Sequence, residues 1–446
     1  MLDLSTKKKL SNVVHWTTDI NQLYHPTAIF GQDTQDVIYS HNNLNATKFI
    51  PILLKEWFFL VKKDGYLVID YKPNKICDWQ KLEENMWWLW KNKYEIIFHG
   101  SINSSKTENS TENKLINFIK NKESYFKKNL DPITFLPPAL STETMPKKNN
   151  GYLRFICKKK ESTVILGDHM NKWTFGIITN GARKDWLEDI INSIRKQNVP
   201  EYEILVCGSY YDRHEPDFRY IPYNQRDDKG WITKKKNIIA KEAKYQNICI
   251  IHDRILFDKN WYKGMKKWGN CFEVLAVPQL FINNNERFGD WTCNKDFDIK
   301  TADNFIPITT GHCEYKDWDK DIPGYAGVII IKKSIMEKNG FSETLYWGKQ
   351  YDDLLMHQDI NSKGYILRMN PHAITYSKTK SVFGFNWFYE FDSQKLGKLK
   401  NVNILIKISY YLLYILGFKK NSKILNWLKI FIKKNRNIKT HQDTKK

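Results

Sequence analysis

The chain has 446 residues, which is enough for two or three domains with separate hydrophobic cores. Its 70 lysines and arginines exceed its 49 aspartates and glutamates, giving a formal net charge of +21. These basic residues are spread through Lys- and Asn-rich sequence and form no recognisable binding motif, so we expect no nucleic-acid partner. The seven cysteines include no Cys-x-x-Cys pair, which favours a reducing compartment and argues against a disulfide framework or a zinc site.

The first part of the chain predicts a small α/β domain. Residues 35–70 predict a strand, a loop, an amphipathic helix, a turn at Lys62–Gly65 and a second strand. Two further strand-like segments, 94–100 and 151–160, are expected to close the sheet as an antiparallel pair. This region is similar to the fourth strand, the following helix and the fifth strand of a class I SAM-dependent methyltransferase.

That resemblance lacks the parts that bind the cofactor. Only about 35 residues precede Asp36, too few for three strand-helix units, and no glycine-rich loop follows a strand there. We therefore expect residues 1–160 to be a truncated methyltransferase-like α/β domain without SAM binding. An unrelated small α/β domain is the equal alternative.

Residues 173–261 predict an open parallel sheet. Phe175–Asn180 form an apolar strand that ends before Gly181, and further strands are expected at Tyr202–Cys207 and Ile248–Ile251. Between the first two strands, apolar residues at helical spacing predict a helix: Trp186, Leu187, Ile190, Ile191 and Ile194. Polar residues follow the strands, and parallel sheets bind ligands at their carboxyl edge.

Two segments bear a family resemblance. Residues 175–208, "FGIITNGARKDWLEDIINSIRKQNVPEYEILVCG", and 324–365, "GYAGVIIIKKSIMEKNGFSETLYWGKQYDDLLMHQDINSKGY", resemble a GT-A-fold glycosyltransferase of the family-2-like group. The blocks occur in the family's order and span about half of the chain. The resemblance implies a Rossmann-like mixed sheet with helices on both faces at residues 161–395. It also implies transfer of a sugar, such as a hexose, from a nucleotide-sugar donor.

On the donor side, the resemblance places the nucleoside at the end of the first strand, near Thr179, Asn180, Gly181 and Arg183. An ordinary strand-to-helix turn is the alternative reading of these residues. The family usually has an acidic residue after the second strand, where this chain has Gly208, so the base that is bound stays open.

The helix expected at 230–243 resembles the family helix that begins near the diphosphate. Lys236 and Asn237 are the candidates for that contact. Lys234 and Lys235 are expected on the solvated face, because a run of charges usually lies there.

His252-Asp253-Arg254 stands where most family members have an Asp-x-Asp that binds a divalent metal. Asp253 and His252 are candidate ligands for Mn²⁺ or Mg²⁺, with His372 as a further candidate. Alternatively, Arg254 supplies the positive charge and no metal is needed. A capped strand end with a surface ion pair is the purely structural reading.

On the acceptor side, Asp352 and Asp353 match the family's acidic pair at the start of a helix, where the helix dipole keeps a carboxylate ionised. The resemblance makes Asp353 the base that deprotonates the acceptor hydroxyl and Asp352 an orienting residue; an ordinary acidic helix start is the alternative. Candidate acceptor-pocket residues are Trp347, Gly348, Asp290 and Trp291.

The C-terminal segment, 396–446, combines the apolar run 402–418 with a lysine-rich amphipathic pattern. It predicts helices lying on an anionic membrane surface, or else two helices packed on the catalytic domain. The N-terminus has no apolar run of the signal-peptide kind, so we expect a cytoplasmic protein peripheral to the inner face of the membrane.

These features together predict an inverting glycosyltransferase of surface polysaccharide synthesis with a glycan or lipid-linked glycan acceptor. Arg254 and Gly208 keep a first alternative open, which is a catalytically inactive protein that binds nucleotide-sugar or glycan. The second alternative is a SAM-dependent methyltransferase with an appended domain. The sequence names neither the sugar nor the linkage.

Overall fold

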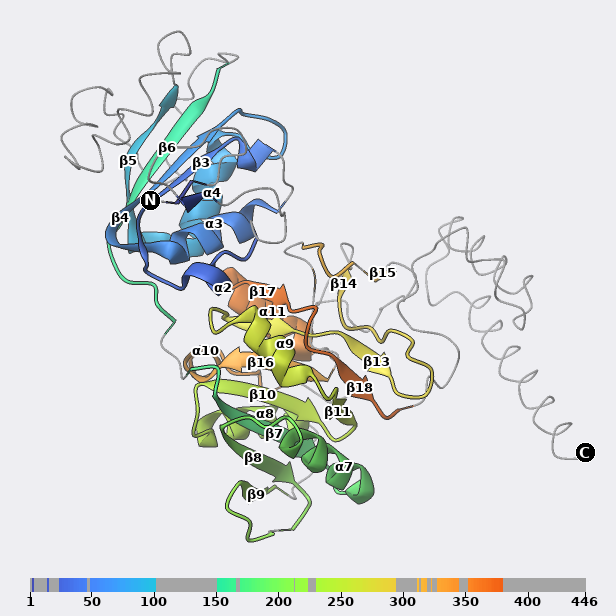
Figure 1. The fold of residues 1–446 in the computed structure, drawn as a ribbon. Helices are drawn as coiled ribbons and strands as arrows, with labels where there is room; N and C mark the ends of the chain where they lie inside the picture. Colours follow the sequence, from blue (N-terminus) through green and yellow to red (C-terminus); the bar gives the residue numbers. More distant parts are fainter. Residues whose placement is uncertain are drawn as a thin grey trace, which may run out of the picture.

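The structure is a computed structural model, and it describes residues 2–3, 14–15, 24–45, 49–101, 151–165, 169–211, 213–223, 230–293, 311–312, 314–318, 322, 327–344 and 352–379. Two large β-sheets organise this part of the chain (Figure 1). The N-terminal sheet ends at residue 159 and the second sheet begins at residue 172. The predicted C-terminal helices and the candidates Trp347 and Gly348 lie outside the described residues.

The N-terminal sheet has the order β2-β1-β3-β4-β6-β5. Strands β1 to β4 run parallel, and β6 lies antiparallel between β4 and β5, so the predicted closing antiparallel pair is confirmed. The elements are β1 (Leu2–Asp3), β2 (Val14–His15), α2 (Thr27–Phe30), β3 (Gln35–His41), a 3-10 turn (Asn43–Asn45), α3 (Ile50–Leu60), β4 (Val61–Tyr71), α4 (Trp79–Trp90), a second 3-10 turn (Lys91–Lys93), β5 (Tyr94–Ser101) and β6 (Leu153–Lys159).

The turn predicted at Lys62–Gly65 is instead an irregularity inside β4. Gln35 pairs with Val61 and Val37 pairs with Tyr66, so four residues of β4 lie between paired positions. Asp64 adopts the left-handed conformation there, with φ of 64°. A β-bulge accommodates extra residues in this way without ending the strand.

The second sheet has the order β17-β12-β16-β10-β7-β8-β9. β10, β7, β8 and β9 are parallel, as predicted for the first three, and β16 runs antiparallel between β10 and β12, so the sheet is mixed. Its strands are β7 (Lys172–Thr179), β8 (Glu201–Gly208), β9 (Phe218–Pro222), β10 (Asn247–His252), β12 (Val274–Ala276), β16 (Val328–Lys332) and β17 (Leu367–Met369). Smaller pairings join β11 (Ile255–Phe257), β13 (Gln279–Phe281) and β18 (Thr375–Ser377), and β14 (Thr292–Cys293) with β15 (Gly311–His312).

Helices cover both faces of the second sheet, which confirms the predicted mixed α/β class. On one face, α7 and α9 pack against Trp173, Phe175 and Ile177 of β7. On the other face, α8, α10 and α11 pack against Ile178 and its neighbours. The alternation follows from the two-residue period of a strand. The helices are α7 (Lys184–Arg195), α8 (Trp231–Glu242), α9 (Trp261–Trp268), α10 (Lys333–Lys338) and α11 (Asp352–Ser362).

The predicted apolar stripe of α7 is confirmed for four of its five residues: Leu187, Ile190, Ile191 and Ile194 are buried. Trp186 instead lies part-exposed, where the Arg183 guanidinium lies 5.0 Å from its ring centre.

Buried ion pairs join the two sheets. Lys55 of α3 contacts Glu273 at 2.8 Å, and its Nζ also donates to the Gly364 carbonyl at 2.7 Å. Arg368 of β17 contacts Glu56 of α3 at 2.7 Å. Figure 1 shows α2 and β17 at this junction. Buried charges are stable only when paired, so these contacts fix the two sheets against each other.

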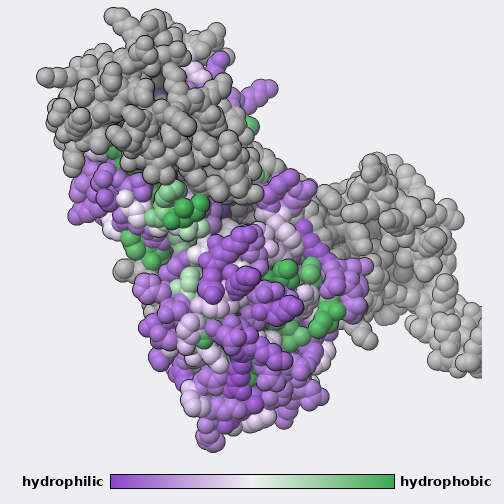
Figure 2. Space-filling model, viewed as in Figure 1, coloured by the Kyte–Doolittle hydropathy of each residue, from purple (hydrophilic) through white to green (hydrophobic). Residues whose placement is uncertain are grey.

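The described surface on the face seen in Figure 2 is mainly hydrophilic. On the face seen in Figure 2, apolar side chains form only small separate patches. Within the described residues, no helix has the length and apolar character that a membrane crossing needs.

Candidate active site

The strand ends of the second sheet converge on the Asp253 carboxylate. The Thr179 hydroxyl, at the end of β7, donates to Asp253 Oδ2 at 2.8 Å. Arg183, just before α7, donates to Asp253 Oδ1 at 2.9 Å. The Gly181 amide donates to the Thr179 hydroxyl at 3.0 Å. Two of the predicted donor-side residues, Thr179 and Arg183, therefore contact Asp253, and Gly181 is linked to it through Thr179.

Asn180 points its side chain to the backbone of the same turn. Its Oδ1 accepts from the Ala182 amide at 3.0 Å, which is a local turn contact. Gly181 has a φ of 81°, and a Cβ there would lie 2.7 Å from the Ser209 carbonyl oxygen. The turn after β7 therefore needs a glycine to pass so close to the end of β8.

Gly208 stands after the second strand, where the resemblance leads one to expect an acidic residue. It pairs with Thr179 and has a φ of 137°. A Cβ at this position would lie 1.9 Å from the Thr179 carbonyl oxygen. No side chain fits there, so an acidic contact to the nucleoside cannot come from this position.

Two lysines of α8 point toward this edge. Lys235 is buried, and its Nζ donates to the Thr179 carbonyl at 2.7 Å. The prediction that Lys235 lies on the solvated face is therefore wrong, because α8 packs with this side against the end of β7. Burial lowers the pKa of Lys235.

Lys236 links α8 to the acidic pair at the start of α11. Its Nζ donates to Asp352 Oδ2 and to Asp353 Oδ1, both at 2.7 Å. Burial opposes the charge of Lys236, but the Asp353 and Asp352 carboxylates outweigh it and raise the pKa of the ammonium. The predicted helix start at Asp352 is confirmed, and Lys236 of α8 contacts both carboxylates of this helix end.

The Asp353 carboxyl has a raised affinity for a proton. Burial, and then the charge of Asp352, raises the pKa of Asp353 to about 6. A carboxyl with a pKa near neutral is suited to general base catalysis, because it accepts a proton readily and yet is ionised at pH 7. Burial and a like charge are the usual way in which proteins produce such a group.

His252 and Arg254 flank Asp253, and each has a buried nitrogen without a hydrogen-bond partner, Nε2 and Nε respectively. Burial, followed by the charges of Arg254, Lys236, Arg183 and Lys235, lowers the pKa of His252 well below its ordinary value. The imidazole is therefore neutral at pH 7. Four cationic side chains lie close enough to influence this one ring.

The described residues do not fit a divalent metal. Both oxygens of Asp253 already accept hydrogen bonds, and neutral His252 is surrounded by cations that would repel Mn²⁺ or Mg²⁺. Among the described residues, no three His, Cys, Asp or Glu side chains are grouped as metal ligands would be. The charged side chains around the predicted metal position include four cations and three carboxylates, so positive charge is in excess there.

His372 lies apart from this group. Its amide donates to Asn370 Oδ1 at 3.0 Å, and its carbonyl lies against Gly264 of α9. Burial, and then the charges of Lys267 and His25, lowers its pKa. These neighbours belong to α9 and the junction between the sheets, so the structure does not bring His372 together with Asp253.

Asn237 is turned toward the chain that leads to the acidic pair. Its amide nitrogen donates to the Phe341 carbonyl and to Glu343, both at 2.9 Å, and its oxygen accepts from the Phe341 amide at 2.8 Å. A Cβ at Gly340 would lie 3.0 Å from that oxygen. Asn237 therefore positions the segment before α11, and its amide is occupied in this structure.

Asp290 and Trp291 are buried in the protein interior. Asp290 accepts from the Gln279 amide, Arg287 and Tyr315, at 2.8, 2.7 and 2.8 Å. Trp291 Nε1 donates to the Asp317 carbonyl at 3.0 Å. Both side chains have partners within the fold, so their role in the structure is to hold the segment after β13.

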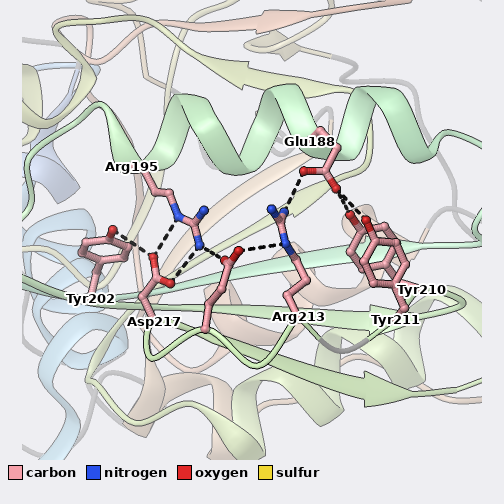
Figure 3. A network of polar contacts seen from close by, with 8 residues as sticks. Glu188, Arg195, Tyr202, Tyr210, Tyr211, Arg213 and Asp217 are labelled. Carbon is pink, nitrogen blue, oxygen red and sulfur yellow. Dashed lines mark hydrogen bonds and ion pairs between the residues drawn. The ribbon is translucent and has the colours of Figure 1, made fainter.

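A polar network fixes the connection between β8 and β9 against α7 (Figure 3). Arg195 donates two hydrogen bonds to Asp217, at 3.0 and 2.9 Å, and Tyr202 donates to the same carboxylate at 3.0 Å. Arg213 donates to Glu188 of α7 at 2.7 Å. The network holds the chain that leaves the candidate site beyond Gly208.

No family model matches the chain, and no curated protein matches it. Among solved structures, S. aureus TarS 1–349 in complex with UDP-GlcNAc matches with 13% identity, a TM-score of 0.32, and coverage of 47% of this chain and 60% of that one. The mannosyltransferase PcManGT from Pyrobaculum calidifontis with GDP-Man and Mn²⁺ has 14% identity, a TM-score of 0.33, and coverage of 47% and 57%. GalNAc-T7 with UDP, GalNAc and Mn²⁺ has 12% identity, a TM-score of 0.35, and coverage of 46% and 43%.

The chain thus spans at most 60% of the length of these three structures. At such identities and TM-scores the likeness does not bear on function, which has to be inferred from the site itself. The methyltransferase resemblance of residues 1–160 stays a prediction.

Proposed function

We propose that this chain is a GT-A-type glycosyltransferase that moves a sugar from a nucleotide-sugar donor to a hydroxyl group of a glycan acceptor. The observation that supports this best is the nearness of Asp353 to the strand ends. Asp353 accepts a hydrogen bond from Lys236, whose charge lowers the pKa of His252, and the charge of Arg254 acts on the pKa of Asp353. A carboxyl of raised pKa and a group of cations at one sheet edge are the two components that glycosyl transfer requires.

In the proposed reaction, Asp353 takes the proton of the acceptor hydroxyl. The hydroxyl oxygen forms a bond to the anomeric carbon of the donor sugar, and the bond from that carbon to the phosphate oxygen breaks. The nucleoside diphosphate leaves with the electron pair, so attack from the opposite face inverts the anomeric centre. Lys236 touches Asp352 and Asp353, so its charge acts directly on the proposed base.

The proposal is tested by nucleotide release from UDP-, GDP- and dTDP-sugars, with and without added glycan. Asp353→Asn is expected to abolish most of the release. Asp359→Asn is the matched control, because Asp359 lies on the same helix in an exposed ion pair with Lys363. No release from any donor by the intact protein would contradict the proposal.

The second candidate function is a binding protein without turnover. Gly208, which excludes a side chain beside Thr179, and Arg254, in the place of a second acidic residue, favour it. Tight binding of a nucleoside diphosphate by a protein that releases nothing from any sugar nucleotide would support this candidate. If residues 1–160 had methyltransferase activity, calorimetry would detect binding of SAM. We expect no SAM binding.

For cellular location, we propose a cytoplasmic protein on an anionic membrane surface, with a lipid-linked acceptor. The support is the lysine-rich amphipathic sequence of residues 396–446, which lie outside the described part of the chain. Removing residues 401–446 is expected to abolish sedimentation with phosphatidylglycerol-containing liposomes at low salt. Equal sedimentation of the intact and shortened proteins would contradict this.

A further inference from the structure

The candidate site contains cations that have no carboxylate partner. Among the described residues, Lys235 and Arg254 form no ion pair. The Lys235 ammonium donates to the Thr179 carbonyl and lies over the Trp231 ring, and the Arg254 guanidinium lies over the Phe288 ring. Arg254 also keeps a buried Nε without an acceptor. A cation that is removed from water without an ion pair of its own is costly, so a bound anion would stabilise this arrangement.

The charges of the whole group support the same conclusion. Four cationic side chains (Arg183, Lys235, Lys236 and Arg254) meet three carboxyl groups (Asp253, Asp352 and Asp353). The carboxylates are each engaged by Arg183 or Lys236, and the four cations against three carboxylates leave an excess of one positive charge. The excess is therefore located beside the ends of β7 and β10.

The backbone at this point keeps the guanidinium close to the strand ends. Gly327, immediately before β16, has a φ of 101°, and a Cβ there would lie 3.0 Å from Arg254 Nη2 and 3.7 Å from the ring of His252. The Arg254 guanidinium also lies 5.8 Å from the Phe288 ring centre. A glycine at 327 thus leaves the space that the guanidinium occupies next to His252.

We propose that this edge binds a nucleoside diphosphate directly through Lys235 and Arg254, without a bridging divalent metal. The positive charge that family members obtain from a metal at an Asp-x-Asp is here supplied by the protein. An arginine is suited to the task because its planar donors match two phosphate oxygens. The assignment of the diphosphate to a sugar donor rests on the proposed function, whereas binding of the diphosphate itself does not.

The experiment is calorimetric titration of the full chain with UDP, GDP and inorganic pyrophosphate, in excess chelator and then in Mn²⁺. We expect at least one of the nucleotides, and pyrophosphate, to bind in chelator with a Kd that Mn²⁺ changes by less than about threefold. Lys235→Met and Arg254→Met are each expected to weaken binding roughly ten- to hundredfold, the usual effect of losing a charged hydrogen bond. Lys241→Met, an exposed position on the same helix as Lys235, is the matched control and should change nothing.

Two variants at position 254 keep the test sharp if Arg254→Met folds poorly. Arg254→Lys keeps the charge and should retain part of the binding. Arg254→Asp places a carboxylate beside neutral His252, so its binding should become dependent on Mn²⁺. Thermal melting of each variant checks that the fold is intact.

The outcomes separate this inference from the proposed function. Binding in chelator by a protein that never transfers sugar would leave the inference standing and contradict the glycosyltransferase. Sugar transfer or diphosphate binding that requires Mn²⁺ in the intact protein would overturn the inference. Absence of binding to all three probes, with or without Mn²⁺, would also overturn it.

Discussion

Thr179 and Gly208 lie opposite each other at the ends of β7 and β8, and the Thr179 carbonyl occupies the space that a Cβ at position 208 would need. The same carbonyl accepts the hydrogen bond of Lys235. The backbone of Gly208 and the ammonium of Lys235 thus meet at one oxygen atom. A substitution of Gly208 or of Lys235 is therefore expected to disturb the contact that the other residue makes with this oxygen.

Gly208→Ala should therefore both destabilise the fold and weaken diphosphate binding. The left-handed backbone and the close carbonyl together should cost more than the 1–3 kcal/mol that is typical, as an order of magnitude, of a strained backbone position. Gly31→Ala is the control, because Gly31 has a φ of 74° but a Cβ there would approach only Thr34, at 3.5 Å. Urea denaturation of both variants would show this, and equal losses would mean that the contact with Thr179 is unimportant.

Asp353→Asn should reduce turnover by roughly 10²–10⁴-fold, the usual contribution of a general base. Binding of nucleoside diphosphate should change little, since the donor contacts lie on the other side of Lys236. Asp352→Asn should have a smaller effect on turnover. Steady-state kinetics with one donor would measure both variants, and small equal losses would identify the pair as an ordinary helix start.

The acid limb of the pH profile should report Asp353. The pKa of this carboxyl is raised to about 6, so the base is protonated, and kcat/KM falls, as the pH drops below that value. Asp352→Asn removes the neighbouring negative charge that favours the proton on Asp353. The limb should then move to lower pH in this variant, and an unchanged limb would mean that another group titrates.

Arg195→Met should lower the free energy of unfolding by about 1–2 kcal/mol, because the guanidinium forms two hydrogen bonds to Asp217 in a half-exposed position. Lys241→Met should stay within about 0.5 kcal/mol of the original protein, as exposed substitutions usually do. Midpoints of urea denaturation would compare the two variants. An equal effect would mean that the network in Figure 3 contributes nothing measurable to stability.

The strands and helices that shape the site were predictable because hydrophobic periodicity reports burial directly. The strands ending at Thr179 and His252 lie where their apolar patterns predicted them, whereas the helix starting at Asp352 was expected from the family resemblance alone. The antiparallel position of β16 could not be read from its four apolar residues, because a strand buried on both faces has the same pattern in either direction.

Side-chain roles were less predictable than elements. Lys235 belongs to a run of three lysines, and only the packing of α8 against β7 shows that it is buried. Asn237 and Asp290 are polar residues at positions predicted to bind ligand, but their partners come from segments far along the chain or from backbone groups. A single sequence gives no information about such distant contacts. The one available signal for Lys235 was its spacing of four from Trp231, whose ring it contacts.

The ion pairs at the junction of the two sheets set a limit on how the molecule can be divided. A fragment beginning at residue 161 would leave Glu273 and Arg368 without Lys55 and Glu56, and each lost partner would strand a charge in what is now the interior. The two sheets are therefore expected to lose their structure together on heating, as one calorimetric transition. The N-terminal sheet is therefore expected to form one interior with the second sheet and not to fold as a separate domain.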